Sequence, residues 1–170
     1  MTEFSVDETT ARLRSSLATV QWAVAQVPAK WTHVIPDYYP PDAWSVAMNL
    51  AHMCVYEEGI AAPMLAALAA GGDGTGAIKS AREEFLTGAT ELSKAPVVDI
   101  LRRLTVCREE QIAVLEGYDQ GRFNEPVTSA WATGQHGSAP HSAGWVATKT
   151  FQHTWEHGNA ILRMALFAPP

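Results

Sequence analysis

The chain has no cluster of lysine and arginine, and it has little cysteine. Its 170 residues include 12 Lys and Arg against 18 Asp and Glu, which gives a formal net charge of −6. Proteins bind nucleic acid chiefly through its phosphates, so we expect no nucleic-acid partner for this acidic chain. The two cysteines, Cys54 and Cys107, lack a Cys or His partner at zinc-finger spacing. We therefore expect two small buried residues rather than a structural zinc site or a disulfide.

The sequence also lacks a signal-like start and a long apolar run. Its first residues are acidic and polar, whereas a signal peptide starts with basic residues followed by an apolar stretch. The most apolar run, about residues 59–70, contains Pro63 and is too short to span a bilayer. We therefore expect a cytoplasmic protein with no membrane partner. The length predicts a single domain covering residues 1–170.

Strand-like alternation of apolar and polar residues is absent, and four long segments carry a helical pattern instead. The first covers about residues 7–27, and Pro28 ends it. The second covers about residues 42–70, with Asp42 as its N-cap and a kink at Pro63. Because nearly all of the second segment is apolar, we expect it to be buried on more than one side.

The second half of the chain continues the helical pattern. A short polar helix is predicted at about residues 79–93, a long helix from Pro96 to about residue 118, and a last helix at about residues 145–168. Residues 119–144 read as a long loop, and such loops are usually functional or ordered by a ligand. Together these segments predict an all-α four-helix bundle with long crossover loops. Cofactor sites in such bundles lie between facing helices.

Three histidines lie within these apolar helices. His153 and His157 are four residues apart in the last helix and therefore share a face, and His52 lies in the second helix. If the two helices pack together, the three imidazoles converge, and three protein ligands with an open position form a catalytic metal site. A divalent metal would satisfy three buried neutral imidazoles at once. The sequence alone leaves an alternative open, in which the three histidines are hydrogen-bonded core residues without a metal.

The spacing argues against two known metal motifs. A zincin helix places Glu directly after its first histidine, where this chain has Thr154. A di-iron bundle requires Glu three residues before a histidine, and here Thr150 precedes His153 and Thr154 precedes His157. One mononuclear site is therefore indicated, and imidazole suits zinc, copper, iron and nickel alike. Because neutral imidazole is the ligand, metal occupancy should fall below a pH of about 6.5.

Two other side chains are candidates for catalysis. Arg108 lies on the mostly apolar face of the helix after Pro96, where it would bind a substrate carboxylate or lie at the surface; we favour the surface position. Tyr56 would donate a proton or act as an amphipathic core residue, and we favour the core role. In the long loop, His136 and His141 would approach the metal or remain solvated, and we favour solvation.

Three tryptophans lie near predicted helix starts, close to the expected meeting point of the histidines. They are Trp44, Trp145 and Trp155. Such residues would line a substrate cavity or pack in the core and at helix junctions, and we favour packing.

Trp44 and the run Asn49-Leu50-Ala51-His52, with the His153-x-x-x-His157 pair in the last helix, resemble the DinB/YfiT-like metalloenzymes. The chain length, the helix order and the long loop before the final helix agree with that family, so the resemblance covers nearly the whole chain. It implies an up-down-down-up bundle in which the three histidines hold one divalent metal, commonly zinc or nickel. It also implies a homodimer, and the second helix, which is apolar nearly all round, supports that expectation.

The resemblance further implies a reaction. Relatives of known activity use a low-molecular-weight thiol, such as mycothiol or bacillithiol, as S-transferases or as maleylpyruvate isomerases. The mycothiol-dependent isomerases typically have Glu where this chain has His153, so S-transfer is favoured over isomerisation. A metal would lower the pKa of a bound thiol and hold it as the nucleophilic thiolate.

The sequence is therefore compatible with three functions. The first is a metal-dependent thiol S-transferase, or an isomerase, acting on a small-molecule substrate. The alternative is a metal- or small-ligand-binding helical bundle without catalysis. The third is an interaction protein whose histidines are structural.

Overall fold

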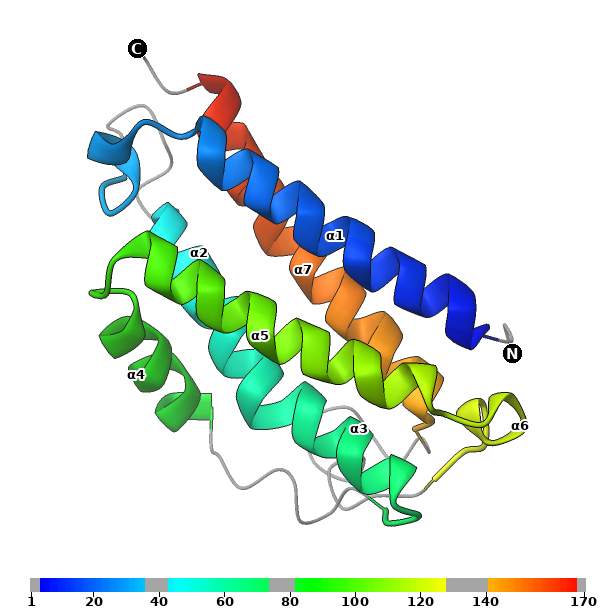
Figure 1. Ribbon diagram of the computed structural model, residues 1–170. Coiled ribbons are helices and arrows are strands. Elements are labelled where there is room, and N and C mark those ends of the chain that lie inside the picture. Colours follow the sequence, from blue (N-terminus) through cyan, green and yellow to red (C-terminus); the bar gives the residue numbers. More distant parts are fainter. Residues whose placement is uncertain (1–3, 36–42, 74–81, 128–140, 168–170) are drawn as a thin grey trace.

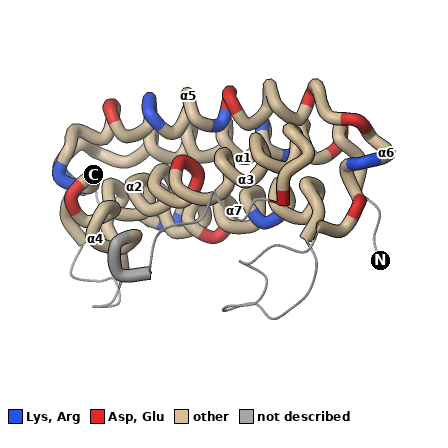
Figure 2. The backbone as a smooth tube through the Cα atoms, turned by 90° about the horizontal axis from the view of Figure 1, so that it is seen from below, with Lys and Arg blue, Asp and Glu red and all other residues tan. Residues whose placement is uncertain are grey.

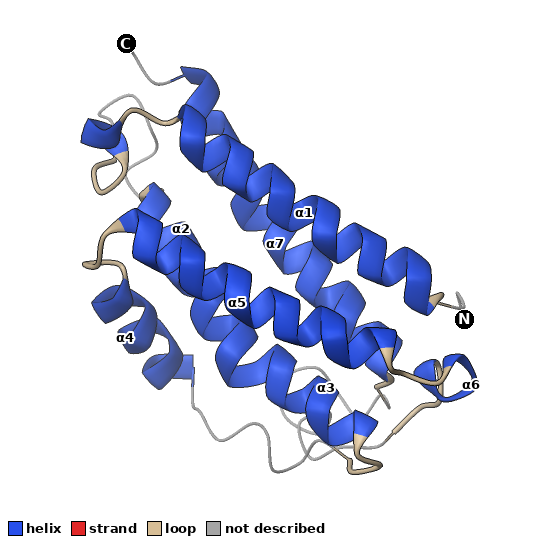
Figure 3. Cartoon of the chain, viewed as in Figure 1, coloured by secondary structure: helices blue, strands red, loops and turns tan. Residues whose placement is uncertain are grey.

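The described part of the chain is helical apart from its connections. The computed structural model describes residues 4–35, 43–73, 82–127 and 141–167. Figure 3 shows helices and no strand in these ranges, where a single backbone bridge pairs Val127 with His141. The all-α prediction is confirmed. The helices are α1 (Val6–Gln26), a 3-10 turn η1 (Ala29–Trp31), α2 (Val46–Tyr56), a π-helical turn η2 (Glu57–Ala61), α3 (Ala62–Ala69), α4 (Arg82–Leu92), α5 (Val97–Glu116), α6 (Gln120–Phe123) and α7 (Ala143–Phe167).

Four long rods form the bundle: α1, the continuous α2–α3 rod, α5 and α7 (Figure 1). Helices α1 and α7 run side by side in one direction, and α2–α3 and α5 run in the other. This is the up-down-down-up order that the family resemblance implied. Helix α4 packs outside the bundle against α2. The core contains fully buried residues from each rod, among them Leu13, Leu50, Leu104 and Ile161.

Two glycines allow α1 and α7 to approach closely. A Cβ at Gly158 would lie 3.1 Å from the Cγ2 atom of Val20, and a Cβ at Gly144 would lie 3.0 Å from Phe4. The Phe4 contact lies at the start of both helices and the Val20 contact lies further along both, so the two helices run parallel. The last helix, which carries two of the three candidate histidines, is thereby held in place along the bundle.

The second helix starts later than predicted. Helix α2 begins at Val46, and Ser45 is its N-cap, because the Ser45 Oγ accepts a hydrogen bond from the Met48 N–H at 3.2 Å. The predicted start at Asp42 was therefore wrong, and Asp42 itself lies outside the described residues. Serine caps a helix as well as aspartate does, so the local sequence offered two similar signals three residues apart.

Pro63 disturbs the second helix, as predicted, but the disturbance takes the form of an extra residue. In the π-helical turn η2, the Ala62 N–H donates to the Glu57 carbonyl, five residues back. Pro63 then lies in the first turn of α3, where it needs no donor. The turn places Glu57 in the core, where its side chain is fully buried. Single π turns of this kind are frequent at functional sites.

The predicted long loop contains a short helix. Helix α6 begins after Asp119, whose side chain accepts from the Arg122 N–H at 3.0 Å, and it buries Phe123 completely. Charged residues of both signs are mixed along the described helices (Figure 2). Within the described residues, none of the helices combines the length and the apolar character that a membrane crossing demands.

Candidate metal centre

His52 from α2 meets His153 and His157 from α7 between the two helices. Nitrogen atoms of the three rings all lie within 4.8 Å of one another. The ring centroids are 4.6 to 4.9 Å apart in all three pairs. The spacing of four residues places the α7 pair on one face, and the packing of α2 on α7 brings His52 opposite. The predicted convergence is present, and metal binding by these atoms stays a prediction.

Asn49 holds one of the three imidazoles. Its Oδ1 lies 2.9 Å from Nδ1 of His157. Its amide nitrogen donates to the carbonyl oxygens of Trp44 and Ser45 at 3.0 and 2.9 Å, which orients the amide oxygen toward the imidazole. Nδ1 of His157 therefore carries the proton, and Nε2 keeps its lone pair for a metal. No local sequence pattern indicated a role for Asn49, although it precedes His52 by three residues and so shares its helix face.

The other two imidazoles have polar atoms without partners. Within the described residues, Nδ1 of His52 and Nδ1 of His153 are buried and make no hydrogen bond. An unsatisfied buried polar group costs about 1 to 3 kcal/mol. A bound divalent cation would offset this cost, because neutral imidazole is a common metal ligand. The three residues therefore fit a three-imidazole metal site.

The environment keeps these histidines neutral. Burial lowers the pKa of His52. Burial, followed by the nearby His52, lowers the pKa of His157 to about 4. Burial, followed by the charges of His157, His52 and Arg108, lowers the pKa of His153 to about 2. At neutral pH the site therefore presents the protonation state that metal binding requires.

Aromatic rings surround the three histidines. Trp44 stacks on His157 with ring centroids 5.5 Å apart and an interplanar angle of 7°. It also meets His52 edge-on at 4.9 Å, and Phe85 from α4 meets His52 edge-on at 5.9 Å. Trp44 thus packs on two of the three histidines beside the candidate metal site, in line with the packing role that we favoured.

Tyr56, one of the two catalytic candidates, lies beside the same site. Its ring centroid is 4.2 Å from that of His153. Burial raises the pKa of Tyr56 to about 12, and a side-chain hydrogen bond with Thr150 opposes part of that increase. The phenol therefore stays protonated at neutral pH and remains a proton donor.

Arg108 is fully buried, so the prediction of a surface position was wrong. Its guanidinium forms an ion pair with Glu57 of η2 through two hydrogen bonds. Its other N–H groups donate to the Leu13 carbonyl at 2.9 Å, the Ser16 Oγ at 3.1 Å and the Thr154 Oγ1 at 2.6 Å. Because an arginine has five N–H donors, none is left for a substrate carboxylate. The partner Glu57 lies 51 residues away in sequence, where no local pattern reveals it.

The remaining histidine and tryptophan predictions had mixed outcomes. His141 is buried, so its predicted solvation was wrong; it pairs with Val127 through the backbone and stacks on Trp145 at a centroid distance of 3.9 Å. Among the described residues, it is not a member of the candidate metal group. His136 lies outside the described residues. Trp155 is 53% exposed, so the prediction that it packs in the interior was also wrong.

Both cysteines are buried free thiols, as predicted. Burial raises the pKa of both, to about 12 for Cys107. Neither thiol ionises at neutral pH, so neither is a nucleophile there.

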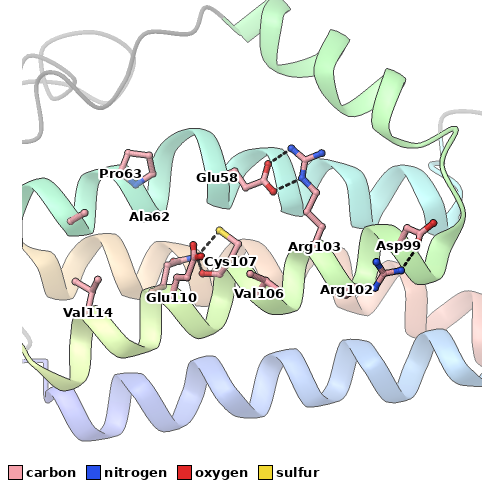
Figure 4. Close-up of a pocket in the computed structure, with 12 residues that line it drawn as sticks. Glu58, Ala62, Pro63, Asp99, Arg102, Arg103, Val106, Cys107, Glu110 and Val114 are labelled. Atoms are coloured by element: carbon pink, nitrogen blue, oxygen red, sulfur yellow. Dashed lines mark hydrogen bonds and ion pairs between the residues drawn. The ribbon is translucent and has the colours of Figure 1, made fainter.

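A separate hollow of about 820 Å³ lies between the η2–α3 segment and α5 (Figure 4). None of the three histidines lines it. Two arginines at its wall are already paired, Arg103 with Glu58 and Arg102 with Asp99. We therefore assign the candidate function to the histidines.

Comparison with known proteins agrees with the fold. A sequence model described as the DinB superfamily matches residues 5–161. No curated protein matches the sequence. A crystal structure of a Streptococcus pneumoniae protein has a TM-score of 0.76 at 11% identity, covering 99% of this chain and 94% of that one. An uncharacterised protein from Clostridium difficile 630 has a TM-score of 0.72 at 10% identity, covering 97% and 98% of the two chains.

A mycothiol-dependent maleylpyruvate isomerase has the same bundle, with a TM-score of 0.68 at 13% identity. The likeness covers 95% of this chain but only 63% of the isomerase. At these identities the structural likeness shows the fold alone.

Proposed function

The chain belongs to the DinB superfamily, and on that premise we propose that it is a thiol-dependent S-transferase whose divalent metal is held by His52, His153 and His157. The convergence of these three imidazoles carries the proposal, because two of them have buried Nδ1 atoms that no described residue satisfies. Three protein ligands match the count in catalytic metal sites, which keep a further position open. We propose zinc or nickel, since imidazole suits both.

The metal would supply Lewis acidity, which lowers the pKa of a bound thiol or water. The side chains around it would orient and protect the site. Asn49 keeps the Nε2 atom of His157 free of a proton, and Trp44 and Phe85 cover the imidazoles with apolar rings. Tyr56, protonated at neutral pH, would donate a proton to the product.

The nucleophile in this proposal is a small thiol from solution, such as mycothiol or bacillithiol, and the substrate is a small electrophile. The chain's own thiols do not serve, because burial raises the pKa values of Cys54 and Cys107. The family resemblance supports a low-molecular-weight thiol, since the isomerase with the same fold depends on mycothiol.

Metal content tests the first half of the proposal. Protein purified without a histidine tag should contain about one divalent metal per chain by elemental analysis. The metal should be lost in His52→Ala, His153→Ala and His157→Ala, because each removes one of three ligands. His33→Ala is the matched control, since His33 is exposed and outside the candidate group. Unchanged metal content in the three ligand variants would contradict the proposal.

Thiol binding tests the second half. In cobalt-substituted protein, mycothiol or bacillithiol should produce a sulfur-to-cobalt charge-transfer band, and loss of an electrophile should require both metal and thiol. If the protein holds cobalt but no thiol changes the spectrum and no electrophile is consumed, the transferase proposal falls. The chain would then be a metal-binding bundle without turnover.

A further inference from the structure

The ion pair of Glu57 and Arg108 lies in the centre of the bundle, fully enclosed by protein. Glu57 comes from η2, directly after the helix that carries His52, and Arg108 comes from α5. Gln111 also donates to the Glu57 carboxylate at 2.7 Å. A buried ion pair contributes little net stability, because desolvation of the two charges offsets their attraction. Its distinctive property is geometric, since the planar guanidinium directs its donors in fixed directions.

One of those donors reaches the helix of the other two histidines. Nη2 of Arg108 donates to Oγ1 of Thr154 at 2.6 Å, and the Thr154 hydroxyl donates to the Thr150 carbonyl at 2.8 Å. Thr154 directly follows His153 and precedes His157 by three residues. The carboxylate at the other end follows Tyr56, whose ring lies against His153. A continuous series of hydrogen bonds therefore joins the His52 rod to the helix of His153 and His157.

Resting on the proposed function, we propose that Glu57, Arg108 and Thr154 are positioning residues that fix the rotation of α7 about its axis. In doing so they set the directions in which His153 and His157 point toward His52. Apolar contacts alone tolerate small rotations of a helix, whereas a hydrogen bond weakens steeply with angle and distance. A metal site requires ligand placement within about 0.5 Å, so the added constraint matters at the histidines.

The π-helical turn explains how two adjacent glutamates are used differently. Glu57 points into the core and pairs with Arg108, while Glu58 points to the rim of the outer hollow and pairs with Arg103 (Figure 4). Both arginines belong to α5. Within the described residues, the hydrogen bonds of the exposed pair run between η2 and α5, so it joins the same two rods without reaching the histidines. It is therefore the natural comparison for the buried pair.

The decisive variant is Thr154→Val, which removes one hydroxyl and leaves the ion pair intact. We expect it to weaken cobalt binding by about tenfold or more, as loss of a supporting hydrogen bond does at other metal sites, and to change the visible cobalt spectrum. Thr154→Ser keeps the hydroxyl and should restore both properties. Thr154→Ala is a second hydroxyl-free variant in case the valine variant fails to fold.

The matched control is Ser16→Ala, which removes another acceptor of Arg108, on α1, where no histidine of the site lies. Its cobalt affinity and spectrum should equal those of the wild-type protein, even if its unfolding free energy falls as much as that of Thr154→Val. Arg103→Met, which breaks the exposed pair, should behave in the same way. Equal cobalt affinities and spectra for Thr154→Val and Ser16→Ala would overturn the inference.

Failure of the proposed function gives a different result. If the wild-type chain binds no cobalt, the metal proposal falls, and crystal structures of the metal-free variants decide the inference. The His52–His153 centroid separation, 4.9 Å here, should then change in Thr154→Val and stay the same in Ser16→Ala. An unchanged separation in both variants would reject a positioning role.

Discussion

Asn49 controls the state of a neighbouring histidine without carrying a charge. Its amide orientation is fixed by two backbone carbonyls, and its oxygen accepts from His157. We predict that Asn49→Ala lowers metal affinity by roughly 10- to 100-fold, because the His157 ring loses its orientation and its preferred tautomer. A competition titration with a coloured chelator measures the change.

Asn49→Asp is the control for this prediction. Aspartate keeps an acceptor for the His157 N–H but loses both donors to the carbonyls. Its metal affinity should therefore lie closer to that of the wild-type protein than to that of Asn49→Ala. An alanine variant that binds metal as tightly as the wild-type chain would show that Asn49 has no such role.

The lowered pKa values of the histidines predict acid sensitivity in the metal-free protein. The pKa is about 4 for His157 and about 2 for His153 in the folded state, and an unfolded histidine titrates near about 6.5. Between these limits the unfolded chain binds more protons than the folded chain, so stability rises with pH. The free energy of unfolding should therefore fall as the pH drops from about 6.5 toward 4. Above pH 6.5 these histidines should make no pH-dependent contribution to it.

Urea denaturation of the metal-free protein at several pH values measures this slope. His157→Ala should show a shallower slope in the same window, whereas His33→Ala should not. Equal slopes in all three proteins would show that His157 does not cause the loss of stability at low pH. The same pKa values lower the pH at which we expect the protein to lose its metal. The sequence predicted metal loss below pH about 6.5, whereas protons compete with the metal at His157 only near pH 4.

At the scale of the helices, local signals predicted most helix ends and a disturbance at Pro63, but not the π-helical form of that disturbance. Pro63 indicated a disturbance, since proline cannot continue a regular helix without losing a hydrogen bond. The sequence did not predict that an extra residue would turn Glu57 inward. That outcome depends on Arg108, which is 51 residues away and reaches Glu57 only when α5 has packed on the rod.

The two arginines of α5 allow a quantitative comparison. Arg108→Met leaves the Glu57 carboxylate buried without its partner, so we predict a loss of about 3 to 5 kcal/mol in unfolding free energy. Arg103→Met breaks an exposed pair and should cost about 0 to 1 kcal/mol. The double variant Glu57→Met, Arg108→Met should recover most of the loss, because no charge is left buried. Chemical denaturation measures all three, and equal losses for the two arginine variants would contradict the prediction.

For the molecule as a whole, the periodicity of apolar residues predicted the helices, and the family resemblance predicted the order in which they pack. The three histidines were predictable because the i, i+4 spacing and the apolar setting are local properties. The role of Asn49 and the burial of Arg108 depend on side chains from other helices, which no local pattern contains. Site residues that act through tertiary contacts were therefore the ones missed.

The structure moves the expected homodimer contact away from the second helix. The apolar character of the second helix was one argument for it, but α2 is covered by α4, α5 and α7, which accounts for its apolar faces. Large exposed apolar residues lie on several helices, and three of them lie on α1 and α7, which run side by side (Figure 1). Trp22 and Trp155 are each 53% exposed, and Leu166 is 64% exposed. Exposed apolar patches often mark interaction surfaces.

We therefore predict a homodimer formed through the outer face of α1 and α7. Trp22→Glu and Trp155→Glu would bury a carboxylate in an apolar interface, so each should convert the dimer to a monomer in light scattering at micromolar concentration. Val98→Glu is the control, since Val98 is 67% exposed but lies on α5. The histidines on α7 face α2 rather than this surface, so the monomeric variants should keep their metal. A monomeric wild-type chain would contradict the homodimer, and a dimer unaffected by both tryptophan variants would contradict this interface. Neither result would bear on the proposed metal site.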